Sequence, residues 1–292
     1  MLPWLRLTLV PGVSPRAQQE LLKVFGAPQA VLDAPQAELS SVAAPAVVQA
    51  LARGPSQGQV DRTLRWLEAS GHYLLALGDA RYPQALLTIP DPPTVIYAKG
   101  RVELLNATGL AIVGSRNASA QGVRDANAFA SALSRAGLCI VSGMALGIDA
   151  AAHRGGLAGP GSSIAVMGTG ADIVYPAGNL GLAEDLGARG CLVSEFALGT
   201  DPAAGNFPRR NRLISGLARG VLVVEAGKPS GSLVTARLAL EQNRDVFAIP
   251  GSIHSPLSRG CNDLIKQGAK LVECANDILF ELALPLVADA AH

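Results

Sequence analysis

The sequence predicts an α/β protein with a mainly parallel sheet that is covered by helices on both faces and preceded by a small all-helical domain. From Gly109 onward, short apolar runs that end in Gly or Ser alternate with helical segments. This alternation is typical of right-handed βαβ units, whose parallel strands are buried on both faces. Before that point, residues 1–75 carry apolar side chains at helical spacing. We therefore expect a Rossmann-like domain behind a helical one.

The helical domain is predicted over residues 1–75. Apolar side chains recur at helical spacing in residues 17–25 and 60–67, and Pro15 suits the first position of a helix. The turn from Pro11 to Pro15 resembles the hairpin of a SAM-like or helix-hairpin-helix module. Ser14 stands where a DNA-binding hairpin of that type has its second glycine. We therefore expect a structural or partner-binding role for this domain.

Residues 76–108 are expected to form a proline-rich connector packed on the next domain. Pro83, Pro90, Pro92 and Pro93 exclude a continuous helix there. The extended Rossmann-like domain is predicted over residues 109–292. Its strand–helix pairs are expected at 110–114 and 121–136, 139–143 and 148–158, 163–168 and 180–188, 191–196 and an arginine-rich helix, 221–225 and 232–243, and 245–250 and 262–267.

Composition limits the kind of partner. The chain is 49% hydrophobic and 16% charged, with a net charge of +1, so nucleic-acid binding would have to come from a local patch. The cysteines lack CxxC spacing, which favours free thiols in a reducing cytoplasm. The histidines are isolated and form no zinc pattern, and the apolar runs are too short to cross a membrane. We expect no metal, no cofactor and no membrane contact.

One segment after Asp201 carries locally unopposed positive charge, since the next acidic residue is Glu225. Arginine forks suit phosphate oxygens, and an aromatic ring can stack on a base. The alternative interpretation is a solvated arginine face with the aromatic side chain in the core. The binding candidates in this segment are Asn206, Phe207, Arg209, Arg210, Asn211 and Arg212.

Glycine-rich loops are expected at the carboxyl ends of the strands, where ligands of such sheets bind. Each loop precedes a helix whose first amides are free to bind anions. The loops contain Gly114-Ser115-Arg116-Asn117, Gly143-Met144-Ala145-Leu146-Gly147, Gly168-Thr169-Gly170 and Pro229-Ser230-Gly231-Ser232. The phosphate-binding candidates among them are Gly114, Ser115, Arg116, Gly143, Met144, Gly231 and Ser232.

Other motifs carry weaker signals. The run from Gly168 has Ile173 where a dinucleotide fingerprint needs its third glycine, and no P-loop pattern occurs. Asp149 and His153 share one helix face, but they lack further metal ligands, so a helix-start aspartate and a structural histidine are expected. Glu195 and Glu225 close strands without a visible nucleophile, which favours hydrogen-bonding roles over acid–base chemistry.

Four motifs occur together in the order found in the DprA (DNA processing protein A, Smf) family. They are Gly114-Ser115-Arg116, the run Ser142-Gly143-Met144-Ala145-Leu146-Gly147-Ile148-Asp149, Phe207-Pro208-Arg209-Arg210-Asn211-Arg212, and Ser230-Gly231-Ser232-Leu233. The chain resembles this family from Gly114 to about Gly268. The resemblance implies a cytoplasmic, non-enzymatic single-stranded-DNA-binding protein of natural transformation and recombination. It would protect incoming strands, displace single-strand-binding protein and load RecA recombinase.

The resemblance also implies which residues contact DNA. They are Arg116 and the segment from Asn206 to Arg212, in which Asn206 replaces a lysine that members often carry. Strand-end loops contribute little to a core. Removing Arg116, or Arg209 together with Arg210, is therefore expected to weaken DNA binding with little change in thermal unfolding. Many members carry a further winged-helix domain, and this chain stops near the end of the Rossmann-like domain, so we expect that module to be absent or to have been removed.

The competing interpretation is an enzyme, a Rossmann-like nucleotide phosphoribohydrolase of the lysine-decarboxylase-like group. Such enzymes carry a PGGxGTxxE motif. The comparable loop begins at Pro229 and runs to Thr235, without the glutamate of that motif at the right offset. Release of adenine from AMP would distinguish the two interpretations.

A homodimer is expected through the C-terminal region. Residues 275–286 read as a helix that is apolar nearly all round, and such a helix needs cover on two sides. The alternatives are that this helix packs against a missing C-terminal domain or lies wholly in the core, and the dimerisation of family members through this part of the chain favours the dimer. The interface candidates are Ile278, Leu279 and Leu282.

Overall fold

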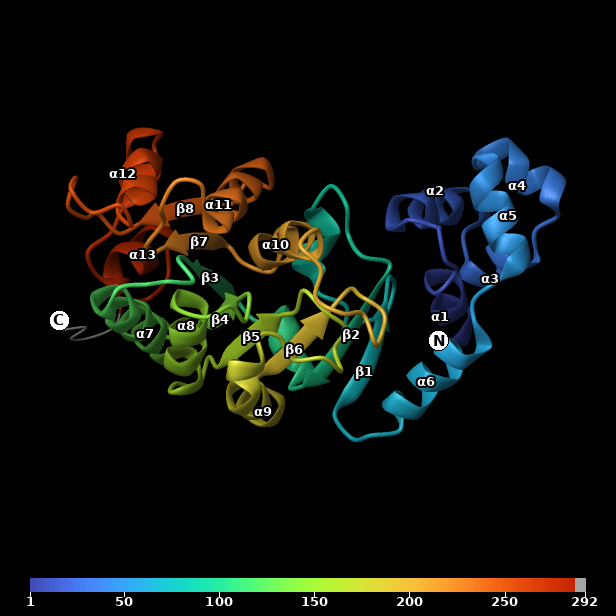
Figure 1. Ribbon diagram of the computed structural model, residues 1–292, viewed down its shortest axis with the longest axis horizontal. Helices are drawn as coiled ribbons and strands as arrows, with labels where there is room; N and C mark the ends of the chain where they lie inside the picture. Colours follow the sequence, from blue (N-terminus) through green and yellow to red (C-terminus); the bar gives the residue numbers. More distant parts are fainter. Residues whose placement is uncertain (287–292) are drawn as a thin grey trace.

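The computed structural model describes residues 1–286, in which strands β1 to β9 form a single sheet (Figure 1). The strand order is β1-β2-β6-β5-β4-β3-β7-β8-β9, and all neighbours from β6 to β9 are parallel. The strands are β1 His72–Ala76, β2 Val95–Gly100, β3 Gly109–Val113, β4 Cys139–Ser142, β5 Ser163–Val166, β6 Cys191–Ser194, β7 Gly220–Val223, β8 Asp245–Ala248 and β9 Lys270–Leu271. The α/β fold class predicted from the alternating pattern is confirmed.

Helices cover both faces of the parallel sheet because its strands are apolar on both sides. On β3, Leu110 and Ile112 face the core under α7 (Ala120–Arg135), α8 (Ile148–Leu157) and α13 (Ala275–Glu281), whereas Ala111 and Val113 face the core under α10 (Asn206–Gly216) and α11 (Gly231–Glu241). The helices of this domain are α7 Ala120–Arg135, α8 Ile148–Leu157, α9 Leu180–Arg189, α10 Asn206–Gly216, α11 Gly231–Glu241, α12 Arg259–Lys266 and α13 Ala275–Glu281. Short 3-10 helices are η1 Gln84–Thr88, η2 Val102–Asn106 and η3 Ala177–Asn179.

The order of the strands reverses between the neighbouring strands β3 and β7. From β3 the chain proceeds through β4 and β5 to β6 on one side, and it later returns to place β7, β8 and β9 on the other. At such a switch point the loops after the two central strands diverge to opposite faces and leave a crevice. The loop after β3 begins at Gly114, and the loop after β7 leads to Ser230, so two predicted binding loops meet there.

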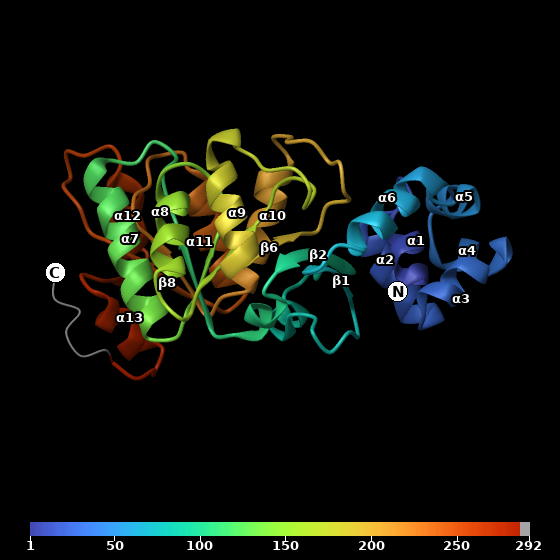
Figure 2. The same cartoon turned by 90° about the horizontal axis from the view of Figure 1, so that it is seen from below.

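The N-terminal helices lie at the β1 edge of the sheet (Figures 1 and 2). An apolar cluster that includes Leu5 and Val60 joins them to Leu74, Val95 and Tyr97. Gln59 Nε2 also donates to the Leu198 carbonyl at 2.6 Å. The helices are α1 Leu2–Thr8, α2 Pro15–Phe25, α3 Pro28–Asp33, α4 Gln36–Val42, α5 Pro45–Arg53 and α6 Gln57–Leu67.

Two antiparallel strands were not predicted. β1 lies at the end of the segment expected to be helical, and β2 lies inside the proline-rich connector. β2 pairs antiparallel with both β1 and β6, which extends the sheet toward the helical domain. The prolines precede β2, so they leave its ladder of hydrogen bonds intact.

His153 on α8 is a structural residue, as its sequence context predicted. The ring is fully buried, and its Nδ1 lies 2.8 Å from Ser163 Oγ. The Ser163 hydroxyl donates its proton to the Ile140 carbonyl, so His153 Nδ1 carries the proton that Ser163 accepts. His153 Nε2 has no partner among the described residues, and burial lowers the pKa of His153 to about 3.

Acidification is therefore expected to destabilise the fold through His153. Its folded-state pKa is depressed, so its stabilising contribution is complete above the unfolded-state pKa of about 6.5 and is lost as the pH falls. Between pH 6.5 and 5 this loss approaches roughly 1.4 kcal/mol per pH unit. Urea denaturation at several pH values measures it. In His153→Gln the decline should be shallower by this amount, and parallel declines in both proteins would contradict the assignment.

Candidate nucleic-acid interface

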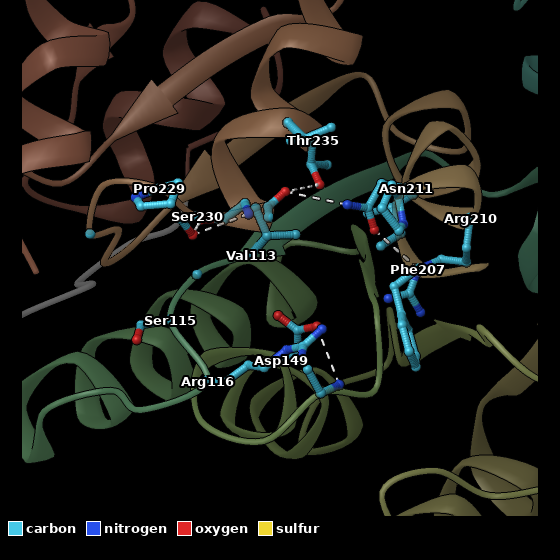
Figure 3. A pocket seen from close by; sticks show the side chains of 18 of the residues that line it. Val113, Ser115, Arg116, Asp149, Phe207, Arg210, Asn211, Pro229, Ser230 and Thr235 are labelled. Atoms are coloured by element: carbon cyan, nitrogen blue, oxygen red, sulfur yellow. Dashed lines mark hydrogen bonds between the residues drawn. The ribbon is translucent and has the colours of Figure 1, made fainter. Parts of the chain in front are cut away.

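A cavity of about 820 Å³ lies at the switch point. The loops after β3 and β7 and the first turns of α10 and α11 line it (Figure 3). Ser115 and Arg116 lie on one side, with Ser230 and Thr235 on the other. The structure thus brings together most of the predicted binding residues, namely Gly114, Ser115, Arg116, Phe207, Arg210, Asn211, Gly231 and Ser232.

Arg116 and Phe207 form the cationic and aromatic part of the cavity. Arg116 is exposed, and its guanidinium carbon lies 5.5 Å from the centre of the Phe207 ring. Arg116 forms no ion pair with any residue in the range 1–286. Phe207 is half-buried against Gly168, where a β-carbon would lie 2.6 Å from the ring. Gly168 therefore makes room for Phe207.

The start of α11 forms the polar wall opposite Arg116. Ser230 caps the helix, because its Oγ accepts from the Ser232 amide at 3.3 Å. The same oxygen lies 2.7 Å from Ser232 Oγ. Asn211 Nδ2 reaches across from α10 to the Gly231 carbonyl at 3.3 Å. A β-carbon at Gly231 would meet no other atom within 4 Å, and the positive end of the α11 dipole points to the same place. This wall can accept an anion.

Arg210 lines the cavity floor, but the structure corrects its predicted role. The side chain is buried, and its Nη1 donates to the carbonyls of Gly143, at 2.6 Å, and Val166. These carbonyls lie at the carboxyl ends of β4 and β5, so Arg210 fastens two strands together. A β-carbon at Gly143 would lie 2.6 Å from Arg210 Nη2. A residue larger than glycine at position 143 would therefore collide with the Arg210 side chain.

Asp149 is the buried counter-charge of Arg210. Its Oδ2 accepts from the amides of Gly143, at 3.2 Å, and Ala145, at 3.3 Å. Burial raises the pKa of Asp149, and the Arg210 charge and the two amides oppose that rise. Burial likewise lowers the pKa of Arg210 to about 10, which leaves the side chain charged at neutral pH. The predicted role of Asp149 at a helix start is confirmed.

Arg209 and Arg212 are engaged with Glu195, outside the cavity lining. Glu195 Oε2 accepts from Arg209 Nη2 at 2.8 Å and from Arg212 Nη2 at 2.6 Å. Arg212 Nε also lies 3.4 Å from Asp91 Oδ2 in the connector. The Arg212 side chain is 11% exposed, against 42% for Arg209, so only Arg209 is partly available to a ligand. The hydrogen-bonding role predicted for Glu195 is confirmed.

The remaining predicted residues lie outside the cavity lining. Met144 is buried with left-handed backbone (φ 65°) and packs in the cluster beside α9. Asn206 is half-buried and donates to the Asp201 carbonyl at 3.4 Å. Glu225, whose hydrogen-bonding role was also predicted, accepts from the Ser119 amide at 2.9 Å and hydroxyl at 2.5 Å. It fixes the start of α7 beside the Gly114 loop.

Sequence reasoning missed Tyr175 as part of the cavity. The residue follows the β5 loop, and its side chain lines the cavity near Phe207. Its signal in the sequence was an aromatic residue in a strand-end segment rich in Gly and Pro.

No group of three or more His, Cys, Asp or Glu residues that could hold a metal ion occurs in residues 1–286.

The C-terminal helix presents a different face from the one predicted. α13 ends at Glu281, and Ile278, Leu279 and Leu282 are buried in the core of their own protomer, under the sheet and beside α7. Phe280 is instead 74% exposed. The three predicted interface side chains are thus core residues, because their spacing aligns them with Ala275 toward the sheet. Their substitution would disturb the core rather than test a dimer.

Comparisons with known proteins agree with the motifs. The family model of DNA recombination-mediator protein A matches residues 73–283. Protein Smf of Escherichia coli is 47% identical over 228 residues, which cover 78% of this chain and 61% of Smf. DNA processing protein DprA of Streptococcus pneumoniae is 47% identical over 203 residues, covering 70% of this chain and 72% of that protein. The chain thus spans about three fifths of the E. coli relative.

Solved structures extend the likeness. The crystal structure of S. pneumoniae DprA superposes with a TM-score of 0.85 at 35% identity, covering 96% of this chain and 98% of that one. DNA processing protein A of Helicobacter pylori, whose structure was described for its single-stranded DNA binding mode, gives a TM-score of 0.66 at 28% identity. That match covers 73% of this chain and 95% of the H. pylori chain.

Within residues 1–286, no helix is both long and apolar enough to cross a membrane.

Proposed function

Because the chain belongs to the DNA recombination-mediator protein A (DprA) family, we propose that it is a non-enzymatic, sequence-independent binder of single-stranded DNA. The observation that carries the proposal is the cavity at the switch point. There an arginine without an ion pair in residues 1–286, a half-buried phenylalanine and the start of α11 face one another. The H. pylori relative, whose structure was described for its single-stranded DNA binding mode, supports the same ligand.

The cavity provides one contact for each part of a nucleotide. Arg116 offers a guanidinium fork to a phosphate, and the start of α11 offers free amides to the next one. Phe207 offers an apolar ring beside them for stacking with a base. A strand whose bases are unpaired can present both phosphates and bases to this crevice, whereas a duplex keeps its bases stacked inside. This arrangement favours single strands.

In the cell, we propose that the protein acts in the cytoplasm during DNA uptake and recombination. It would hold incoming single strands, protect them, displace single-strand-binding protein and load RecA recombinase. A homodimer would join two cavities into one longer track, so long strands would bind more tightly than short ones. Neither Glu195 nor Glu225 lines the cavity: Glu195 Oε2 accepts from two arginines, and Glu225 accepts from Ser119.

Single-stranded DNA should therefore bind far better than duplex, with an affinity that falls with salt. Each phosphate neutralised on a single strand contributes about −0.7 to the slope of log affinity against log salt. With Arg210 buried and Arg212 paired, contacts to two or three phosphates predict a slope of roughly −1.5 to −2 per protomer. Fluorescence anisotropy with oligothymidine and with a duplex of equal length measures both. Equal affinity for the two, or no salt dependence, would count against the proposal.

A further inference from the structure

We propose that Tyr175 is a second base-stacking residue, which works with Phe207 as one aromatic platform. The inference rests on the proposed function, since it assigns a further contact at the same cavity. The Tyr175 and Phe207 rings have centroids 5.6 Å apart and planes inclined by 36°. The Arg116 guanidinium lies 5.5 Å from the same Phe207 ring. Arg116, Phe207 and Tyr175, here called the aromatic platform, therefore form one contiguous cluster, which comes from the loop after β3, the first turn of α10 and the segment after β5.

Tyr175 presents more surface than a packing role needs. The residue is 44% exposed although its ring lies against the Phe207 ring, and it lines the cavity. Within residues 1–286 its hydroxyl forms no hydrogen bond, so the polar end of the side chain stabilises nothing in the protomer. An aromatic side chain on a strand-end loop, half open to solvent beside a cationic group, is suited to bind a planar ligand.

Other parts of the structure hold the platform in place. Gly168 leaves the space that Phe207 fills. The side-chain Nδ2 of Asn179 donates to the Met144 carbonyl at 2.8 Å. This bond ties the segment after Tyr175 to the loop after β4. A platform with fixed members loses little side-chain entropy when a base stacks on it. Two adjacent rings would then accept two bases of the same strand, with Arg116 beside a phosphate between or next to them.

The test compares oligothymidine with an abasic strand of the same length and charge. For the unmodified protein, Tyr175→Phe and Tyr175→Ala, anisotropy gives the affinity for each strand. Tyr175→Ala should bind oligothymidine about 5- to 30-fold more weakly, because one stacking contact is lost. Its affinity for the abasic strand should change by less than about 2-fold, and Tyr175→Phe should match the unmodified protein on both strands, because the ring and not the hydroxyl binds.

Each alternative outcome overturns the inference in a recognisable way. Unchanged binding of oligothymidine by Tyr175→Ala would remove Tyr175 from the interface and leave the proposed function intact. An equal loss on both strands would make Tyr175 a support for the loop and not a stacking residue. If the unmodified protein bound neither strand, the proposed function and this inference would both fail. Tyr175→Leu, which fills similar space beside Phe207 without a ring, repeats the comparison if alanine alters thermal unfolding.

Discussion

Replacing Arg210 by alanine is expected to lower the free energy of unfolding by about 3 to 5 kcal/mol, as when one partner of a buried charge pair is removed. The guanidinium is buried and donates to the carbonyls of Gly143 and Val166, which close β4 and β5. Alanine would leave both carbonyls without this donor and Asp149 without its counter-charge. Guanidinium chloride denaturation, followed by circular dichroism, measures the change.

Arg209→Ala is the matched control, because Arg209 is the neighbouring arginine on the same helix. Its side chain is 42% exposed and shares Glu195 with Arg212. Loss of such a partly exposed pair is expected to cost less than about 1 kcal/mol. Equal destabilisation by the two substitutions would show that Arg210 is not the specific link between β4 and β5. The expectation from sequence, that removing both arginines leaves unfolding unchanged, is therefore narrowed to Arg209, for which it stays a prediction.

The fold was predictable because parallel strands buried on both faces are continuous apolar runs. Each of the predicted strands from β3 to β8 is present, and each is followed by a helix within a few residues of the expected position. β1 and β2 were not predictable in the same way. Their pairing is antiparallel and depends on contact with β6, about 100 residues further along the chain, which no local pattern records.

The site was predictable in its location but not in the role of each arginine. Loops after β3 and β7 meet because strand ends of a parallel sheet share one edge, and the order of motifs revealed this. Whether an arginine faces the sheet or the solvent depends on the rotation of α10. One signal was present: Arg210, Leu213, Ile214 and Leu217 have the i, i+3, i+4, i+7 spacing of a buried face. Arg210 therefore belongs to the apolar stripe of its helix.

The same spacing explains the C-terminal helix. Ala275, Ile278, Leu279 and Leu282 form one stripe, and all are buried against the sheet of the same protomer. The apolar character on the other side comes mainly from Phe280, and the helix ends one residue later. A count of apolar residues over 275–286 overestimated the face that needs cover, because it assumed a longer helix.

Arg116→Ala is expected to weaken the binding of single-stranded DNA by about 10- to 100-fold, which corresponds to one charge-assisted hydrogen-bonding contact of about 1.5 to 3 kcal/mol. Arg116 is exposed at the cavity and unpaired within residues 1–286, so its charge is available to a phosphate. Thermal unfolding should change little, because the side chain contributes only a contact with the Phe207 ring to the protomer. Arg116→Lys should retain part of the affinity, since it keeps the charge but loses the fork.

The most direct test of the account is a titration of one labelled oligothymidine with the unmodified protein, Arg116→Ala and Arg124→Ala. Arg124 is also exposed and lies on the adjacent helix α7, outside the cavity lining, and among the described residues its side chain bonds only to Gln121. Both variants remove one positive charge, so a non-specific electrostatic effect would be the same in each. The account predicts a loss of about 10- to 100-fold for Arg116→Ala and less than about 2-fold for Arg124→Ala. Equal affinities for the two variants would contradict a binding site at the switch point.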